Sequence, residues 1–419
     1  MIELFKEIWA TVRHNKLRTA LTGFAVGWGI FILIFLLGAG NGLINAQMKQ
    51  SERFLANSMA VYGGVTSKPH KGFDMGRRIT LNNRDVLITA NSFKENVGET
   101  APIIQAYSNT FSNGADYVAA QMMSGVYPLK AELDKKEIVH GRFVNDLDIR
   151  EKRKVIVLTQ RQAKELAKFP EQLVGKYIKV NDWMFRVVGI VKDETSGENN
   201  NAFIPYSTMS VMYNFGHNVD CIEFTIRGLA TDEDCEFFEK EYRSRINSNH
   251  DAASDDESSI YIWNRLAQSL QMNTGLGILR TALWIVGLFT LLSGIVGVSN
   301  IMLITVRERT REFGIRKALG AGTWSILRMI VVESMTITTF FGYIGMLCGV
   351  LANEYMNATI GQEVVDTGIF QATMFLNPTV GLDVCIQATI VMILAGTVAG
   401  LVPALKAARV RPIVALNAK

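Results

Sequence analysis

The sequence predicts a membrane protein with four transmembrane α-helices and a large extracytoplasmic α+β domain inserted between helices 1 and 2. Just over half of the 419 residues lie between the first two helices, at 49–280, which is enough for one or two folded domains. A helix needs roughly 20 apolar residues to cross the ~30 Å hydrocarbon core. The apolar residues of this chain gather in four charge-free stretches at 19–48, 281–306, 334–353 and 384–405.

The spans divide the chain into alternating cytoplasmic and outer segments. An amphipathic pattern at 1–18 predicts a helix lying on the cytoplasmic membrane surface. The spans themselves are predicted at 19–45, 281–306, 325–353 and 383–405. The connections are then the outer domain with its helical stalk at 46–280, a cytoplasmic loop at 307–324, an outer loop at 354–382 and a cytoplasmic tail at 406–419.

Lys and Arg residues set the orientation. They concentrate in 1–18, 307–324 and 406–419, whereas the short loop 354–382 contains none. Basic residues in short loops stay in the cytoplasm, so both termini are predicted to be cytoplasmic. Each basic cluster adjoins a span, which argues against nucleic-acid binding as their purpose. The first span is longer than the apolar core of a signal peptide and is interpreted as a retained anchor.

The segment 46–280 shows mixed α and β signals. Asn181-Asp182 is predicted to be a hairpin turn, Thr231 a helix N-cap, and 264–280 a helical stalk that continues into the second span. Strands are predicted at Val155–Leu158, Tyr177–Val180, Phe185–Val191 and Ile222–Arg227, and helices at Gln160–Phe169 and Asp232–Ile246.

Two features of the outer domain allow alternative interpretations. Cys221 and Cys235 are either a disulfide, if the space is oxidising, or two buried thiols. The acidic stretch 247–259 lacks the ligand spacing of a calcium loop, so a solvated loop is expected there.

Several kinds of chemistry lack their sequence motifs. The chain has no phosphate-binding loop with the Gly-x-x-x-x-Gly-Lys pattern, no Cys-x-x-Cys and no His pair at metal-ligand spacing. We therefore expect a non-catalytic subunit without its own cofactor or metal. The spans also lack midplane carboxylates and internal repeats, which disfavours an ion-coupled carrier. Glu333 falls inside the third predicted span, near its cytoplasmic start, from where it could reach the head groups, and Asp383 lies at the outer edge of the fourth.

Glycine pairs four residues apart occur in three spans, and small residues at this spacing let helix backbones approach closely. The contact is expected either within one chain or between subunits. The pairs are Gly23 with Gly27, Gly38 with Gly42, Gly345 with Gly349, and Gly396 with Gly400.

The loop between the second and third spans carries the most informative pattern. Acidic and basic residues alternate from Arg307, and Glu312 precedes Arg316 by four residues, the favoured order for a helical ion pair. Gly320 and Gly322 are suited to ending this helix before the third span. Apolar residues are interleaved with the charges and are expected to form a contact surface: Phe313, Ile315, Ala318 and Leu319. A short charged helix of this kind suits docking into the groove of a partner.

These residues resemble a known family. The chain is similar to the MacB-type ABC-transporter permeases, a group that includes the lipoprotein-releasing LolC/LolE and the cell-division protein FtsX. The resemblance covers nearly the whole chain and is strongest at SNIMLITVRERTREFGIRKALGA (299–321). It continues in RHNKLRTALTGFAVGWG, AGLVPALKAARVRPIVAL and, in the outer domain, SGVYP, HGRF, VGKYIKVNDWMFRVVGIV and AFIPYS.

The resemblance implies a permease that acts as a dimer, with itself or with a similar permease, and binds ABC ATPase subunits on the cytoplasmic side. These subunits would bind ATP and Mg²⁺, and a separate chain must supply them because the fused ATPase of the macrolide exporter is missing here. The coupling helix would run from Glu308 to Gly320, and relatives suggest an inserted part at about 115–215 of a MacB-like periplasmic domain. The residues expected to contact the ATPase are Glu308, Arg309, Arg311, Glu312, Gly314, Ile315, Arg316, Lys317 and Gly320.

By this resemblance, the expected function is efflux of drugs, peptides or lipids from the periplasmic side of the bacterial inner membrane, with a periplasmic adaptor and an outer-membrane duct as further partners. The alternative is an FtsX-like regulator that controls an extracytoplasmic enzyme without transport. A membrane-anchored binding protein is a third hypothesis, but it leaves the loop at 307–324 unexplained. The substrate, the composition of the dimer and the substrate-binding residues stay open.

Overall fold

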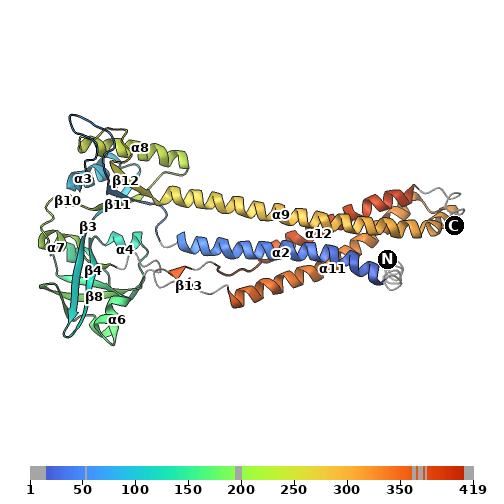
Figure 1. Cartoon of the computed structure of the whole chain (residues 1–419), viewed down its shortest axis with the longest axis horizontal. Coiled ribbons are helices and arrows are strands. Elements are labelled where there is room, and N and C mark those ends of the chain that lie inside the picture. Colours follow the sequence, from blue (N-terminus) through green and yellow to red (C-terminus); the bar gives the residue numbers. More distant parts are fainter. Residues whose placement is uncertain are drawn as a thin grey trace. The chain divides into compact units, whose positions relative to one another are not determined.

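The computed structural model describes residues 16–51, 54–193, 201–360, 365–366, 371–372 and 375–409. The chain forms two compact units (Figure 1). The helical unit contains Met1–Gln47, Gly275–Val364 and Thr373–Lys419. The sheet unit contains Met48–Thr274 with Val365–Ala372.

The described residues contain four helices long and apolar enough to cross a membrane, which agrees with the predicted fold class. They are α2 (Lys16–Ser51), α9 (Arg265–Glu308), α11 (Thr323–Thr359) and α12 (Leu382–Ala408). Stalk and second span form one uninterrupted helix, α9. Helix α11 continues past its predicted end at residue 353, so the predicted loop 354–382 begins as helix. The predicted surface helix at 1–18 and the end of the tail at 410–419 lie largely outside the described residues.

The glycine pairs of the spans are contacts within this chain. A Cβ on Gly345 of α11 would stand 2.1 Å from the backbone oxygen of Gly27 in α2. A Cβ on Gly400 of α12 would stand 2.8 Å from the Ser334 side chain of α11. At Gly38, the amide of Asn353 occupies the space of the missing side chain and donates to the Ile34 carbonyl at 2.9 Å. The small residues therefore hold α2, α11 and α12 together in one protomer.

Gly345→Ala is expected to lower the free energy of unfolding of the helical unit by about 2 kcal/mol. The added methyl group meets backbone, which cannot rotate away, so α2 and α11 must separate. The matched control is Gly277→Ala in α9, where nothing lies within 4 Å of the new Cβ. Reversible unfolding of the full chain in mixed micelles measures both variants. Equal stabilities for the two would contradict a close α2–α11 contact.

The sheet unit is built on a ten-stranded sheet, whose order is β12-β1-β11-β3-β4-β9-β6-β8-β5, with β7 pairing with β3 and β8. Its strands are β1 (Ser58–Gly63), β3 (Val97–Asn113), β4 (Asp116–Val126), β5 (Ile138–Gly141), β6 (Val155–Thr159), β7 (Tyr177–Val180), β8 (Trp183–Val191), β9 (Ala202–Pro205), β11 (Cys221–Ile226) and β12 (Ile260–Asn264). The short pairs are β2 (Leu81–Asn82) with β10 (Asn218–Val219), and β13 (Val365–Asp366) with β14 (Gln371–Ala372). The helices are α3 (Asn83–Ser92), α4 (Leu129–Leu133), α5 (Asp146–Arg150), α6 (Gln160–Leu166), the 3₁₀ turn η1 (Pro170–Leu173), α7 (Tyr206–Met212) and α8 (Asp232–Asn249).

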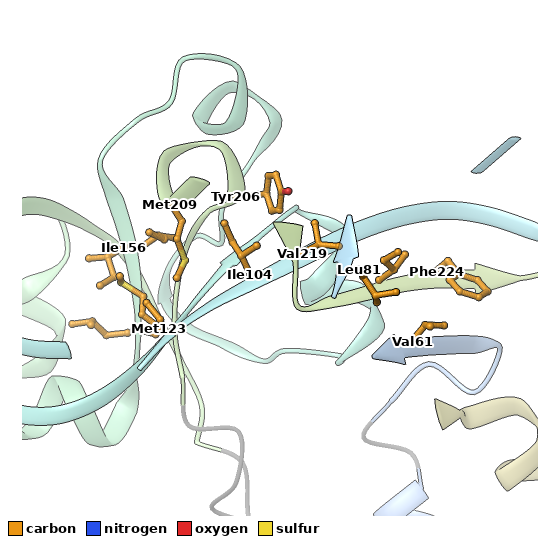
Figure 2. Packing of buried hydrophobic residues seen from close by; sticks show 14 of the residues in the cluster. Val61, Leu81, Ile104, Met123, Ile156, Tyr206, Met209, Val219 and Phe224 are labelled. Atoms are coloured by element: carbon orange, nitrogen blue, oxygen red, sulfur yellow. The ribbon is translucent and has the colours of Figure 1, made fainter. Parts of the chain in front are cut away.

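The long strand β3 joins two parts of this sheet. Its first half pairs with β11 and its second half with β4 and β7. The register shifts between Ala106 and Asn109, where Ser108 has a positive φ of 59°, so the strand bends at this point. Figure 2 shows the core on both sides of the bend, with Met123 and Ile156 in one group and Leu81 and Phe224 in the other. The strands on the β4 side of β3, from β4 to β9, lie within 116–205. The bounds of the inserted part, about 115–215, stay a prediction.

The local predictions for this unit agree with the structure in most places. Asn181 has a positive φ of 51° in the two-residue turn between β7 and β8, and the side chain of Thr231 caps α8. The helix predicted at Gln160–Phe169 ends earlier, at Leu166, because Pro170 lacks the N–H group that would continue it. Cys221 and Cys235 are free, buried thiols, so the disulfide alternative is wrong.

The acidic stretch 247–259 is only in part the solvated loop that its composition predicts, because Asp251, Asp255 and Glu257 are exposed but Asp256 is not. The Asp256 carboxylate is buried and accepts hydrogen bonds from the backbone N–H groups of Ser67 and Lys68 at 2.8 and 3.1 Å. Asn247 is also buried and donates to the Ala253 carbonyl. The acid therefore satisfies backbone donors of a neighbouring loop, a role that composition alone does not reveal. In the described part of the chain, no three His, Cys, Asp or Glu residues are grouped to hold a metal ion.

Candidate coupling site

The predicted coupling helix forms, but it is shorter than Glu308–Gly320. Helix α9 ends at Glu308, Arg309 leaves helical geometry, and a separate helix α10 runs over Thr310–Ala318. Gly320 then adopts a φ of +95°, and its N–H group donates to the Lys317 carbonyl at 3.0 Å. Such a left-handed glycine ends a helix at little cost, and it lets the chain reverse before α11 begins at Thr323.

Three charged residues brace α10 along its length. Arg309 donates to both carboxylate oxygens of Glu312, at 2.9 and 3.1 Å. The predicted pair of Glu312 with Arg316 is present, at 2.9 Å. The hydrogen bonds from Arg309, followed by the charges of Arg309 and Arg316, lower the pKa of Glu312 against an opposing effect of burial. The carboxylate is therefore held ionised, which keeps the brace intact at neutral pH.

Glu333 connects this brace to α11. It is only 5% exposed and lies 3.4 Å from Arg309, measured from Oε2 to Nη1. The expectation that Glu333 reaches the lipid head groups is therefore wrong. A carboxylate buried among apolar residues needs a compensating partner, and Arg309 at the α9–α10 bend supplies one.

An aromatic residue fixes the middle of α10. Phe313 is almost fully buried in the helical core. The central guanidinium carbon of Arg309 lies over its ring, 5.5 Å from the ring centroid. The next residue, Gly314, is buried as well. The prediction that Phe313 belongs to an external contact surface is wrong, because this side chain fills the interior between the helices.

The C-terminal half of α10 is attached to α11 and α12. Arg316 Nη1 lies 3.1 Å from the sulfur of Met329 in α11. Lys317 Nζ donates to the carbonyl of Ala408, the last residue of α12, at 2.6 Å. A cation at a helix C-terminus satisfies a free carbonyl and complements the helix dipole. Helix α10 is therefore tied to both following spans as well as to α9.

The remaining predicted contact residues point to the solvent. Leu319 and Ile315 are 83% and 43% exposed, although both are apolar. Glu308, Arg311 and Gly320 are also exposed. We call the exposed side chains of Arg311, Ile315, Ala318 and Leu319 the outer face of α10. The nine predicted residues thus divide into an inner set that holds α10 in place and an outer set that is exposed.

Sequence reasoning missed the partners of the inner set. Met329 and Ala408 come from other helices and carry no charge, so no local pattern marks them. Glu333 carried a usable signal, since it is a carboxylate inside the third predicted span, whereas Asp383 lies only at the edge of the fourth. A lone carboxylate in a span is expected to have a specific partner.

The family is shown by comparison with known proteins. Residues 19–236 match the model of the MacB-like periplasmic core domain, and residues 284–412 match that of the FtsX-like permease C-terminal region. The chain belongs to the MacB-like family of ABC-transporter permeases. The second match covers the whole of α10 in this MacB-like permease, together with its inner partners Glu333 and Ala408.

Three named relatives align with the whole length of this MacB-like permease. It is 26% identical over 430 residues to the macrolide export ATP-binding/permease protein MacB of Bdellovibrio bacteriovorus. It is 27% identical over 428 residues to the pyoverdine export ATP-binding/permease protein PvdT of Pseudomonas putida. It is 25% identical over 427 residues to the uncharacterized ABC transporter permease YknZ of Bacillus subtilis. Each alignment covers 100% of this chain, but 62% of MacB, 60% of PvdT and 99% of YknZ.

Two solved structures resemble about half of the chain. The periplasmic region of MacB from Actinobacillus actinomycetemcomitans covers 54% of this chain and 95% of its own, with 20% identity and a TM-score of 0.41. The extracellular domain of YknZ covers 50% of this chain and 100% of its own, with 12% identity and a TM-score of 0.40.

Proposed function

We propose that this chain is the permease subunit of an ABC transporter that couples ATP hydrolysis in a separate ATPase subunit to movement of an extracytoplasmic domain. The observation that carries the proposal is the two-sided α10. Its inner residues bind α11 and α12, and its outer face leaves Ile315 and Leu319 exposed beside the charge of Arg311. An exposed apolar anchor with charged neighbours is typical of a protein-binding surface.

The mechanism follows from these attachments. When the ATPase subunits close on ATP, they displace the outer face of α10. Lys317 and Arg309 transfer the displacement to α12 and α11, and the backbone transfers it to α9. No part of this mechanism requires α10 to unfold, since the inner contacts keep it rigid. ATP and Mg²⁺ act in the partner, and this chain supplies no residue to the hydrolysis.

The same proposal fixes the location and the wider assembly. Both termini and α10 face the cytoplasm of a bacterial cell, and the sheet unit faces the periplasm. Two such permeases, identical or similar, pair with the ATPase subunits. The permease drives efflux of a drug, peptide or lipid from the periplasmic side, and a periplasmic adaptor and an outer-membrane duct receive it. The names of the macrolide and pyoverdine export relatives support efflux over a regulatory role.

The test is affinity purification of the tagged full chain from its host in mild detergent, followed by mass spectrometry and an ATPase assay. We expect an ABC ATPase chain to co-purify and to hydrolyse ATP. An adaptor or duct protein in the same eluate supports efflux, whereas a cell-wall hydrolase supports regulation. Absence of any ATPase, even after ATP and vanadate trapping, contradicts the proposal.

A further inference from the structure

A buried cluster of charges lies in the sheet unit where helix α9 begins. Arg265 is the first residue of α9 and is only 5% exposed. Its Nη2 atom lies 3.2 Å from Glu223 of β11 and 3.6 Å from Asp134, which follows α4. Its Nη1 atom lies 3.3 Å from the Ser58 hydroxyl of β1. One guanidinium therefore contacts two strands and the end of a helix.

Two aromatic rings enclose the same guanidinium. Its central carbon lies 4.5 Å from the ring centroid of Phe54 and 4.7 Å from that of Trp263. The rings also contact each other edge to face, with centroids 5.4 Å apart. Phe54 lies just after α2, and Leu55 beside it donates its N–H to the Leu133 carbonyl of α4 at 2.8 Å. The segment that enters the sheet unit after α2 and the segment that leaves it at the start of α9 thus both contact α4 or the residue after it.

Helix α4 is bound to the same cluster by its own charges. Lys130 donates to both carboxylate oxygens of Glu223, at 2.8 and 3.0 Å, and lies 2.9 Å from Asp134. Burial alone would lower the pKa of Lys130, but Glu223 and Asp134 outweigh it and raise this pKa. Removing one member of a buried ionic cluster is strongly destabilising locally, because the remaining charges lose their compensation.

The cluster has room to rearrange. A cavity of about 60 Å³ is lined by Lys130, Asp134, Glu223 and Arg265. Among the described residues, neither Asp134 Oδ1 nor Arg265 Nε has a hydrogen-bond partner. A shift of Arg265 by less than 1 Å would convert its 3.6 Å approach to Asp134 into a hydrogen-bonded ion pair. Both the unused polar atoms and the space for this shift are present.

We propose that Arg265 is a positioning residue that clamps the start of α9 to β11 and α4, so that displacement of α9 is passed to α4 and the part of the sheet unit beyond it. This inference deepens the proposed function and rests on it. From α4 the connection continues through Tyr127, whose ring packs against Tyr206 of α7 with centroids 5.3 Å apart.

The experiment is hydrogen–deuterium exchange on the full chain in lipid nanodiscs, first without the ATPase. Arg265→Met is expected to accelerate exchange in α4 about tenfold or more and to leave the hairpin β7–β8 unchanged. The matched control is Arg280→Met, at an exposed position of the same helix. If Arg265→Met accelerates exchange equally across the whole sheet unit, or does not accelerate it anywhere, the proposed clamp is wrong.

The second comparison uses the co-purified ATPase trapped with ATP and vanadate. In wild type and Arg280→Met, trapping is expected to change exchange in both α10 and α4. In Arg265→Met, the change in α10 is expected to persist and the change in α4 to disappear. The inference is overturned if α4 responds to trapping equally in Arg265→Met and wild type. It is also overturned if α10 of wild type responds and α4 does not.

The two proposals fail in different ways. If α10 of wild type does not respond, or no ATPase co-purifies, the proposed function fails. The exchange comparison without the ATPase then still tests whether Arg265 clamps α9 to α4.

Arg265→Lys replaces Arg265→Met in these experiments if the Met variant does not fold. It keeps the buried charge, but its single ammonium group cannot reproduce the fork that reaches Glu223, Asp134 and Ser58 together. It is expected to retain the fold and lose the α4 response.

Discussion

Leu319→Asp is expected to weaken binding of the ATPase by roughly 30-fold or more while leaving the permease folded. Leu319 is 83% exposed, so its replacement removes no internal contact. A carboxylate at the centre of a partner groove would be desolvated without a designed cation, which is the costliest change at an interface. The measurement is the dissociation constant of the full chain in nanodiscs for the purified ATPase.

Phe237→Asp is the matched control for this substitution. Phe237 lies on α8 of the sheet unit and is 73% exposed, so the change in polarity and exposure is similar. Its affinity for the ATPase should equal that of wild type. Equal affinities for Leu319→Asp and Phe237→Asp would show that the outer face of α10 does not carry the interaction.

Arg309→Ala is expected to lower the free energy of unfolding of the helical unit by about 3 kcal/mol, since it removes the cation 3.4 Å from the buried Glu333. Glu333→Gln alone should cost less, and the double variant Arg309→Ala/Glu333→Gln should be more stable than Arg309→Ala. A neutral amide needs no cation, so much of the penalty disappears with the charge. Reversible unfolding in mixed micelles measures this cycle.

Arg311→Ala is the control for that cycle, because Arg311 lies on the same short helix but is exposed. It should change stability by less than about 0.5 kcal/mol. If Glu333→Gln fails to improve the stability of Arg309→Ala, the pair does not form the link between the α9–α10 bend and α11.

The predictions for Leu319 and Arg309 treat the exposed and the buried residues of the α10 region differently, whereas the sequence pattern did not distinguish them. The alternation of charges around Glu312 and Arg316 was sufficient to predict a helix with an internal ion pair, since residues four apart share a helix face. It was not sufficient to say which face points inward. Phe313 and Ile315 are both apolar and two residues apart, yet one is buried and the other is exposed. Only the position of α11 and α12 decides between them.

The acidic stretch 247–259 shows the same limit in the sheet unit. Its composition predicted exposure, but the buried Asp256 carboxylate accepts hydrogen bonds from Ser67 and Lys68, nearly 190 positions away in the sequence. The polarity of a segment indicates how unfavourable its burial would be. It does not show which hydrogen-bond donors elsewhere in the chain will make burial of an acidic residue favourable. The cluster around Arg265 was invisible for the same reason, as its members come from four separate segments.

The sequence by itself determined the four membrane-spanning helices, the inserted α+β domain, the turn at Asn181, the cap at Thr231 and the position of the short helix after α9. Each of these depends on hydropathy over a window or on neighbours a few residues apart, which the sequence displays directly. The tertiary structure alone decided that the glycine pairs act within one chain, that Glu333 is paired to Arg309, and that Arg265 joins α9 to β11 and α4. Those outcomes depend on which distant surfaces meet, because packing and charge compensation act between segments that no sequence spacing relates.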